Sequence, residues 1–298
     1  KIEIKNLIFE NANFNLNKKN YNFFHNLLNQ NFMNGNLIIK NSNIFFRNSN
    51  DEVLFINKIL KMKYHHETKE LKNIFHSDNE IFNIPFSLES FFNENENKIY
   101  SKINFNLMKI KIDNELTLNN KNKIGKSELF FNKSKKIAEY QIEKDYFNFH
   151  IFDKKDEPNF TFKGKFNLKP FYASLEGDLD EINLNYLFGY NAIVSELLKT
   201  EIFNNKNIDF KLRINAENIY NNDNFKNINL KSKIQDGLID TDNTKFKWRD
   251  FADFELLDSL IFVKNGELIV DGNLKIKVNN FNEVYKFLLT PKNYRNEI

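Results

Sequence analysis

Apolar and polar residues alternate with a period of two along most of this chain. The alternation is most regular around residues 99–107, 146–151, 160–168, 208–215 and 274–279. Strict alternation is typical of a β-strand that has one apolar and one solvated face. Strands of a parallel α/β sheet would instead be apolar at consecutive positions. The pattern predicts a mainly β protein of about fifteen strands, joined by polar, turn-like clusters such as 93–97 and 119–122.

Helical periodicity is confined to three segments, residues 20–30, 183–199 and 281–289. The apolar face of a sheet has to be covered, and three short helices cannot cover this many strands. Two arrangements satisfy the constraint. Either two sheets pack as a sandwich, or one sheet curls around apolar material that is not protein. In the second arrangement we expect the helix at 183–199 to cap one end of the sheet.

One internal repeat is visible about 200 residues apart. Residues 35–48 contain two short alternating segments separated by a polar turn, and the second segment ends in Phe46-Arg47-Asn48. Residues 237–250 repeat this arrangement over the same length and end in Trp248-Arg249-Asp250. The spacing is too long for a solenoid. The repeat therefore predicts a meander unit that occurs twice.

The composition excludes several classes of function. Lys and Arg number 43 against 40 Asp and Glu, so the net charge of +3 is too small to indicate a nucleic-acid partner. The chain has no Cys, which excludes disulfides, thiolate metal sites and a Cys nucleophile. Its 54 Asn and four Arg are typical of an AT-rich genome. No apolar run approaches the length of a membrane-spanning helix, and no signal peptide is apparent.

No pattern indicates catalysis, a metal or a cofactor. The five His do not form a metal-binding spacing, and His65 and His66 are adjacent, so in a strand they point to opposite faces. Nucleophile-elbow, phosphate-loop and dinucleotide motifs are missing. A hydrolase that uses paired carboxylates stays an alternative, although no spacing indicates such a pair.

The C-terminal third contains residues 225–237, FKNINLKSKIQDG, followed by Lys247-Trp248-Arg249-Asp250 and by 258–268, DSLIFVKNGEL. This succession resembles the AsmA-like proteins, which include TamB. Residues 35–44, GNLIIKNSNI, resemble the recurring strand pair of the same family. The resemblance extends over most of the chain, but it is one of general residue pattern and includes no invariant motif.

The resemblance implies a long, curved, mostly antiparallel sheet, folded like a taco into a hydrophobic groove, with a few short helices. It implies a non-enzymatic protein of the Gram-negative envelope that carries phospholipid between the inner and outer membranes. A periplasmic location, an inner-membrane anchor and an outer-membrane or periplasmic protein partner are implied too. The chain begins in mid-pattern at Lys1, so we expect the anchor to belong to a longer parent protein.

We therefore predict one elongated β segment over 1–298, with 1–182 and 200–298 as candidate repeat units joined by the helix at about 183–199. The alternative is a structural β-sandwich scaffold or interaction domain in outer-membrane assembly. The residues predicted to line the groove and bind lipid are the apolar members of the alternating segments: Ile103, Phe105, Leu107, Phe147, Phe149, Ile151, Phe160, Phe162, Phe166, Leu168, Ile208, Phe210, Leu212, Ile214, Ile228, Leu230, Phe246, Trp248, Leu274 and Ile276.

Overall fold

The fold is mainly β and its strands are mostly antiparallel, as the alternation predicts. It is described by a computed structural model, which forms two compact units, Lys1–Lys154 with Thr200–Ile202, and Lys155–Lys199 with Phe203–Ile298. The structure describes residues 6–17, 36–47, 50–67, 69, 72–93, 95–118, 123–131, 134–143, 146–153, 160–168, 171–185, 209–235, 238–264 and 267–295.

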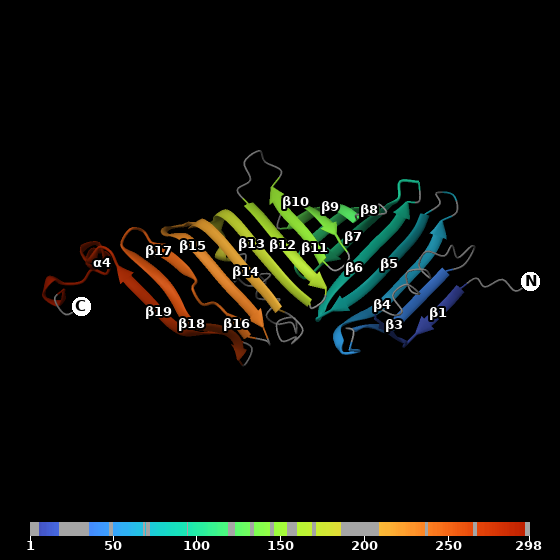
Figure 1. Cartoon of the computed structure of the whole chain (residues 1–298), viewed down its shortest axis with the longest axis horizontal. Coiled ribbons are helices and arrows are strands. Elements are labelled where there is room, and N and C mark those ends of the chain that lie inside the picture. The colour runs from blue at the N-terminus through green and yellow to red at the C-terminus, as the bar shows by residue number, and fades with distance from the viewer. Residues whose placement is uncertain are drawn as a thin grey trace, which may run out of the picture. The chain divides into compact units, whose positions relative to one another are not determined.

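The first unit is a meander. From β3 to β11 each strand pairs antiparallel with the next, while β1 and β2 both pair parallel with β3 (Figure 1). Its strands are β1 (Asn6–Glu10), β2 (Asn13–Leu16), β3 (Asn36–Arg47), β4 (Val53–Glu67), β5 (Lys72–Ile81), β6 (Ile84–Asn93), β7 (Lys98–Phe105), β8 (Ile110–Leu118), β9 (Lys123–Phe131), β10 (Ser134–Ile142) and β11 (Tyr146–Asp153).

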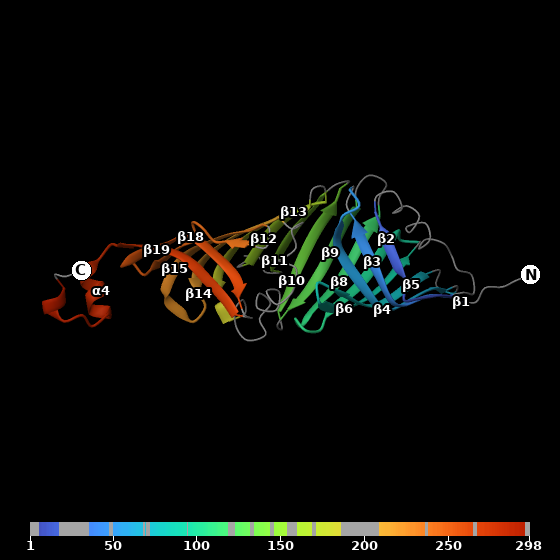
Figure 2. The same cartoon turned by 90° about the horizontal axis from the view of Figure 1, so that it is seen from below.

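The second unit is mixed. β13 and β14 pair parallel, whereas the other strand pairs that the structure describes in this unit are antiparallel. Helix α4 follows β19 at one end of this unit (Figure 2). Its elements are β12 (Phe160–Leu168), β13 (Phe171–Ile182), β14 (Asp209–Ile219), β15 (Asn222–Gln235), β16 (Leu238–Asp240), β17 (Lys245–Trp248), β18 (Ala252–Lys264), β19 (Glu267–Val278), α4 (Phe281–Phe287) and the 3₁₀ helix η1 (Lys292–Tyr294).

Of the three predicted helices, the structure confirms the one at 281–289 as α4. The Asn280 side chain caps it by accepting from the backbone N–H of Glu283. The helix predicted at 20–30 lies outside the described residues. Most of the helix predicted at 183–199 also lies outside them, so its capping role stays a prediction. The described residues form nineteen strands rather than about fifteen, because strands as short as β16 and β17 contain too few alternating positions to recognise.

The two copies of the internal repeat share local features, but only the second has the predicted form of two short strands, β16 and β17. Residues 36–47 of the first copy form the single strand β3. Asn41 in β3 and Asn243 before β17 lie 202 positions apart, and both have positive φ, 45° and 61°. Asn tolerates this left-handed conformation better than most residues. The next residue in each copy is a buried hydroxyl that bonds the neighbouring backbone. Ser42 accepts from the N–H of Ala12, and Thr244 accepts from the N–H of Lys231.

The Arg that ends each copy also has the same role. Arg47 donates from Nε to Oδ1 of Asn15 at 2.8 Å, and Arg249 donates from Nε to Oδ1 of Asn224 at 2.8 Å. Each bond joins the end of the repeated strand to a neighbouring segment of the sheet. The two copies thus share a backbone kink, a buried hydroxyl and a terminal Arg contact.

Each unit has its own cluster of buried hydrophobic residues. In the first unit it lies between β3 and β4 and consists of Leu37, Ile39, Ile59, Met62 and Tyr64. In the second unit it lies on β13, β14 and β15 and consists of Ile182, Ile214, Ala216 and Ile228. Both clusters are small relative to the sheets that carry them.

We expect Leu37→Ala to lower the free energy of unfolding by about 2–5 kcal/mol, because it opens a cavity in the first cluster. Leu37 is 2% exposed, whereas Leu60 in the neighbouring β4 is 51% exposed. Leu60→Ala is therefore the matched control and should cost less than about 1 kcal/mol. Urea unfolding of the two variants measures the difference. Equal losses would contradict a core at β3 and β4.

Candidate functional site

Hydrophobic side chains form continuous rows across the central strands of the first unit. Leu88, Ile103, Ile112 and Leu129 are cross-strand neighbours on β6 to β9. A second row, two residues further along, contains Phe105, Ile110 and Phe131, and the Phe105 ring lies 5.5 Å from that of Phe86. Side chains two residues apart share one face of a strand. We call this surface the apolar face of the first unit.

These hydrophobic side chains are only half-buried. None of the residues of β6, β7 and β8 is buried, although all three strands have neighbours on both sides. In a closed sandwich the apolar face of central strands packs against the second sheet and is removed from water. The buried cluster of this unit lies instead at β3 and β4.

Most of the predicted groove residues of the first unit lie on this face. Ile103 and Phe105 lie in its rows, and the register of β8 to β11 extends it to Phe149 and Ile151, with Phe147 two residues before Phe149. Leu107 is different. It lies in the turn between β7 and β8 and is 58% exposed, because the chain reverses after Phe105 and the alternation no longer sets its direction.

In the second unit the register also brings predicted residues together. Phe162, Gly177, Ile214 and Leu230 form one row across β12 to β15. Phe166 and Phe210 flank Ala173 in another row. Leu212 and Ile228 are on the same strand faces as Ile214 and Leu230. The prediction that these segments share one face is therefore confirmed for the described residues, whereas the concavity of that face stays a prediction.

The apolar face of the second unit continues onto the last strands. The ring of Phe246 stacks on Phe254 at 5.0 Å, and Phe254 pairs with Ile276. Leu274 and Ile276 on β19 are 49% and 52% exposed. Trp248 is covered by the Phe287 ring of α4 at 4.7 Å. Ile208 and the side chains of Phe160 and Leu168 lie outside the described residues.

Two aromatic rings lie across glycines of the adjacent strand. A Cβ at Gly177 would approach the Phe162 ring to 2.3 Å, and a Cβ at Gly125 would approach the Tyr140 ring to 2.0 Å. Glycine is required at both positions because any other side chain would displace the ring. Each ring therefore lies flat along the sheet and covers backbone that would otherwise be exposed.

A polar row, Ser90, Ser101, Asn114 and Ser127, interrupts the apolar face of the first unit, and the sequence analysis did not identify it. Asn114 occupies an apolar position of the alternation, between Ile112 and Leu116. Its Oδ1 accepts from the Tyr140 hydroxyl at 2.6 Å and from the Ser127 hydroxyl at 2.8 Å. Burial raises the pKa of the Tyr140 phenol further above neutral pH, and the protonated hydroxyl donates to Asn114. The signal in the sequence was a polar residue at an apolar position of the alternation.

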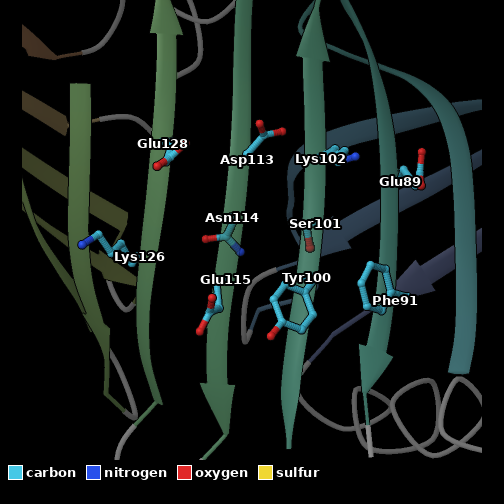
Figure 3. A pocket seen from close by; sticks show the side chains of 10 residues that line it. All are labelled: Glu89, Phe91, Tyr100, Ser101, Lys102, Asp113, Asn114, Glu115, Lys126 and Glu128. Carbon is cyan, nitrogen blue, oxygen red and sulfur yellow. The ribbon is translucent and has the colours of Figure 1, made fainter. Parts of the chain in front are cut away.

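The opposite face of the same strands is charged. A depression on β6 to β9 is lined by Glu89, Lys102, Asp113 and Glu128, among other side chains (Figure 3). Lys98 pairs with Glu115 at 2.5 Å, and this hydrogen bond raises the pKa of the lysine. Exposed pairs of this kind contribute little to stability. We interpret this face as the solvated side of the sheet.

Two of the described histidines contact neighbouring polar side chains of the sheet. His66 is hydrogen-bonded to Asn73, while Nδ1 of His76 is 3.9 Å from Glu89 on the charged face. Within the described residues no cluster of three potential metal ligands occurs, and no helix there is long and apolar enough to cross a bilayer. In comparison with known proteins, the chain matches no protein-family model and no curated sequence.

We expect Gly177→Ala to destabilise the second unit by about 1–3 kcal/mol, since the added methyl group forces the Phe162 ring away from β13. In a Phe162→Leu background the same substitution should cost less, because the ring is gone. Urea unfolding of the two single variants and the double variant measures this coupling. Additive losses would show that ring and glycine are independent.

Proposed function

We propose that this protein binds acyl-chain lipid on the apolar faces of its sheets. The observation that carries the proposal is the half-buried state of every apolar side chain on β6, β7 and β8. Burying such surface contributes about 25 cal/mol per Å². A ligand that covers these rows is therefore strongly favoured over water.

The dimensions of the face fit an acyl chain. Cross-strand rows are two residues apart, or about 6.8 Å along a strand, and an eight-residue strand such as β7 spans about 27 Å. The hydrocarbon of one leaflet is about 15 Å thick, half of a bilayer core. A chain lying along a strand would therefore contact two or three rows, and each buried methylene contributes about 0.8 kcal/mol.

The repetition of the rows supports movement as well as binding. Neighbouring strands are about 4.8 Å apart and present similar side chains at the same level. A lipid that shifts by one strand exchanges one set of Ile and Phe contacts for a similar set. Combined with the resemblance to AsmA-like proteins, this supports transfer of phospholipid between inner and outer membranes, in the periplasm, by a parent protein anchored in the inner membrane.

Lipid extraction from the purified chain, followed by mass spectrometry, tests the proposal. We expect phospholipid to copurify with the protein. The rival function is a scaffold or interaction domain, in which an outer-membrane or periplasmic protein covers the apolar faces. Lipid-free protein that gains stability from such a partner, and none from added lipid vesicles, would favour the scaffold.

We expect Ile103→Asp to reduce the lipid retained per protein at least several-fold, because it places a carboxylate in the apolar row. Folding stability should fall only moderately, since water reaches the half-buried position. The matched control is Asn104→Asp, which introduces the same group on the opposite face of β7. Full lipid retention in folded Ile103→Asp protein would contradict the proposal. Global unfolding of this variant, with no lipid on the wild type, would indicate a closed core.

A further inference from the structure

Asn114 is an amide donor in a polar row that also contains Ser90, Ser101 and Ser127. Apolar rows lie on both sides of it, with Ile103 and Ile112 in one and Ile99 and Leu116 in the other. The neighbours of Asn114 along β8 on the same face are therefore Ile112 and Leu116. An amide that faced only hydrocarbon would lose its hydrogen bonds to water without replacement, which is unfavourable. A lipid-binding face that contains this group therefore discriminates between the parts of a lipid that can lie over it.

The orientation of the amide is fixed by its two hydroxyl neighbours. A carbonyl oxygen has two lone pairs, and Oδ1 of Asn114 accepts both available hydroxyl donors, from Tyr140 and Ser127. Tyr140 belongs to β10 and reaches across β9 to β8. It does so over Gly125, where a Cβ would collide with its ring. The missing side chain on β9 therefore makes this contact possible.

Nδ2 of Asn114 can donate to an acceptor outside the sheet. Figure 3 shows the oxygen of Asn114 on the side of β9 and its nitrogen on the side of β7. Among the described residues, Nδ2 has no hydrogen-bond acceptor. On β7, the Ser101 hydroxyl pairs with the Ser90 hydroxyl at 2.9 Å. The amide thus presents two N–H donors from a position that packing and hydrogen bonds hold in place.

We propose that Asn114 is a specificity-determining residue that donates a hydrogen bond from Nδ2 to the ester carbonyl oxygen of a bound acyl lipid. An ester carbonyl oxygen accepts hydrogen bonds but does not donate them. It therefore suits Asn114, because Oδ1 of this residue already accepts from two hydroxyls and only its N–H donors remain. The alkyl part of the lipid then lies over the row beside it, which contains Ile103 and Ile112. This inference rests on the proposed lipid binding and adds the chemical class of the ligand.

The test uses the full chain and a hydrocarbon fluorophore, diphenylhexatriene, bound to the protein. Methyl palmitate and an alkane of matched length, both supplied from cyclodextrin, compete with the fluorophore. We expect the ester to bind about fivefold more tightly than the alkane, the contribution of one neutral hydrogen bond. Sodium palmitate is a third competitor. A preference for palmitate over both others would overturn the ester assignment in favour of a carboxylate.

Two variants of Asn114 distinguish the loss of the N–H donors from an effect on folding. Asn114→Leu removes the amide, and we expect equal binding of ester and alkane. Asn114→Asp keeps an acceptor for Tyr140 and Ser127 but removes both donors, and it should lose the ester preference too. Asn104→Leu makes the same change on the opposite face of β7, so it should keep the wild-type preference.

Tyr140→Phe tests the positioning of the amide. It removes one of the two donors that hold Oδ1, so the ester preference should fall while alkane binding stays unchanged. Equal binding of ester and alkane by the wild type would overturn the inference and leave the proposed function intact. Failure of the fluorophore and of all competitors to bind would overturn both.

Discussion

Cross-strand register is the constraint on which the rest of this structure depends. In an antiparallel meander the backbone hydrogen bonds fix which residues lie opposite one another, and the period of two sends alternate side chains to opposite faces. Because of this register, the apolar positions of neighbouring strands lie side by side and form rows across the sheet. One such row contains Leu88, Ile103, Ile112 and Leu129. A shift of one residue would move an entire strand's apolar set into water.

Register also explains why the two faces differ so strongly in chemistry. The same strands that present Ile103 and Phe105 on one side present Lys102 on the other, near Glu89 and Asp113. The charged face needs only water and exposed ion pairs. The apolar face needs a cover, and the described helix α4 covers only one end of the second unit through Trp248. This difference between the two faces is the reason why the fold supports the proposed binding of lipid.

Local departures from regular strand structure adapt this plan, and the register shifts by a residue at several strand pairs. Asn41 and Asn243 introduce kinks with positive φ, and buried hydroxyls bond the backbone beside them. Gly125 shows a second kind of departure. By lacking a side chain it lets Tyr140 span a whole strand and hold Asn114. Polar groups on the apolar face are thus positioned by contacts between residues far apart in sequence.

The sequence by itself determined the class of fold, the repeat and the apolar positions of the strands, because alternation is a property of neighbouring residues along one chain. It therefore identified Phe162 and Phe210 as members of apolar segments, and the register confirms that they share a face. It failed at Leu107, where the chain turns, and at Asn114. Only the tertiary structure decided which residues lie opposite one another, which side chains stay half-exposed and which amide is held by Tyr140, because those depend on contacts between strands that no local pattern encodes.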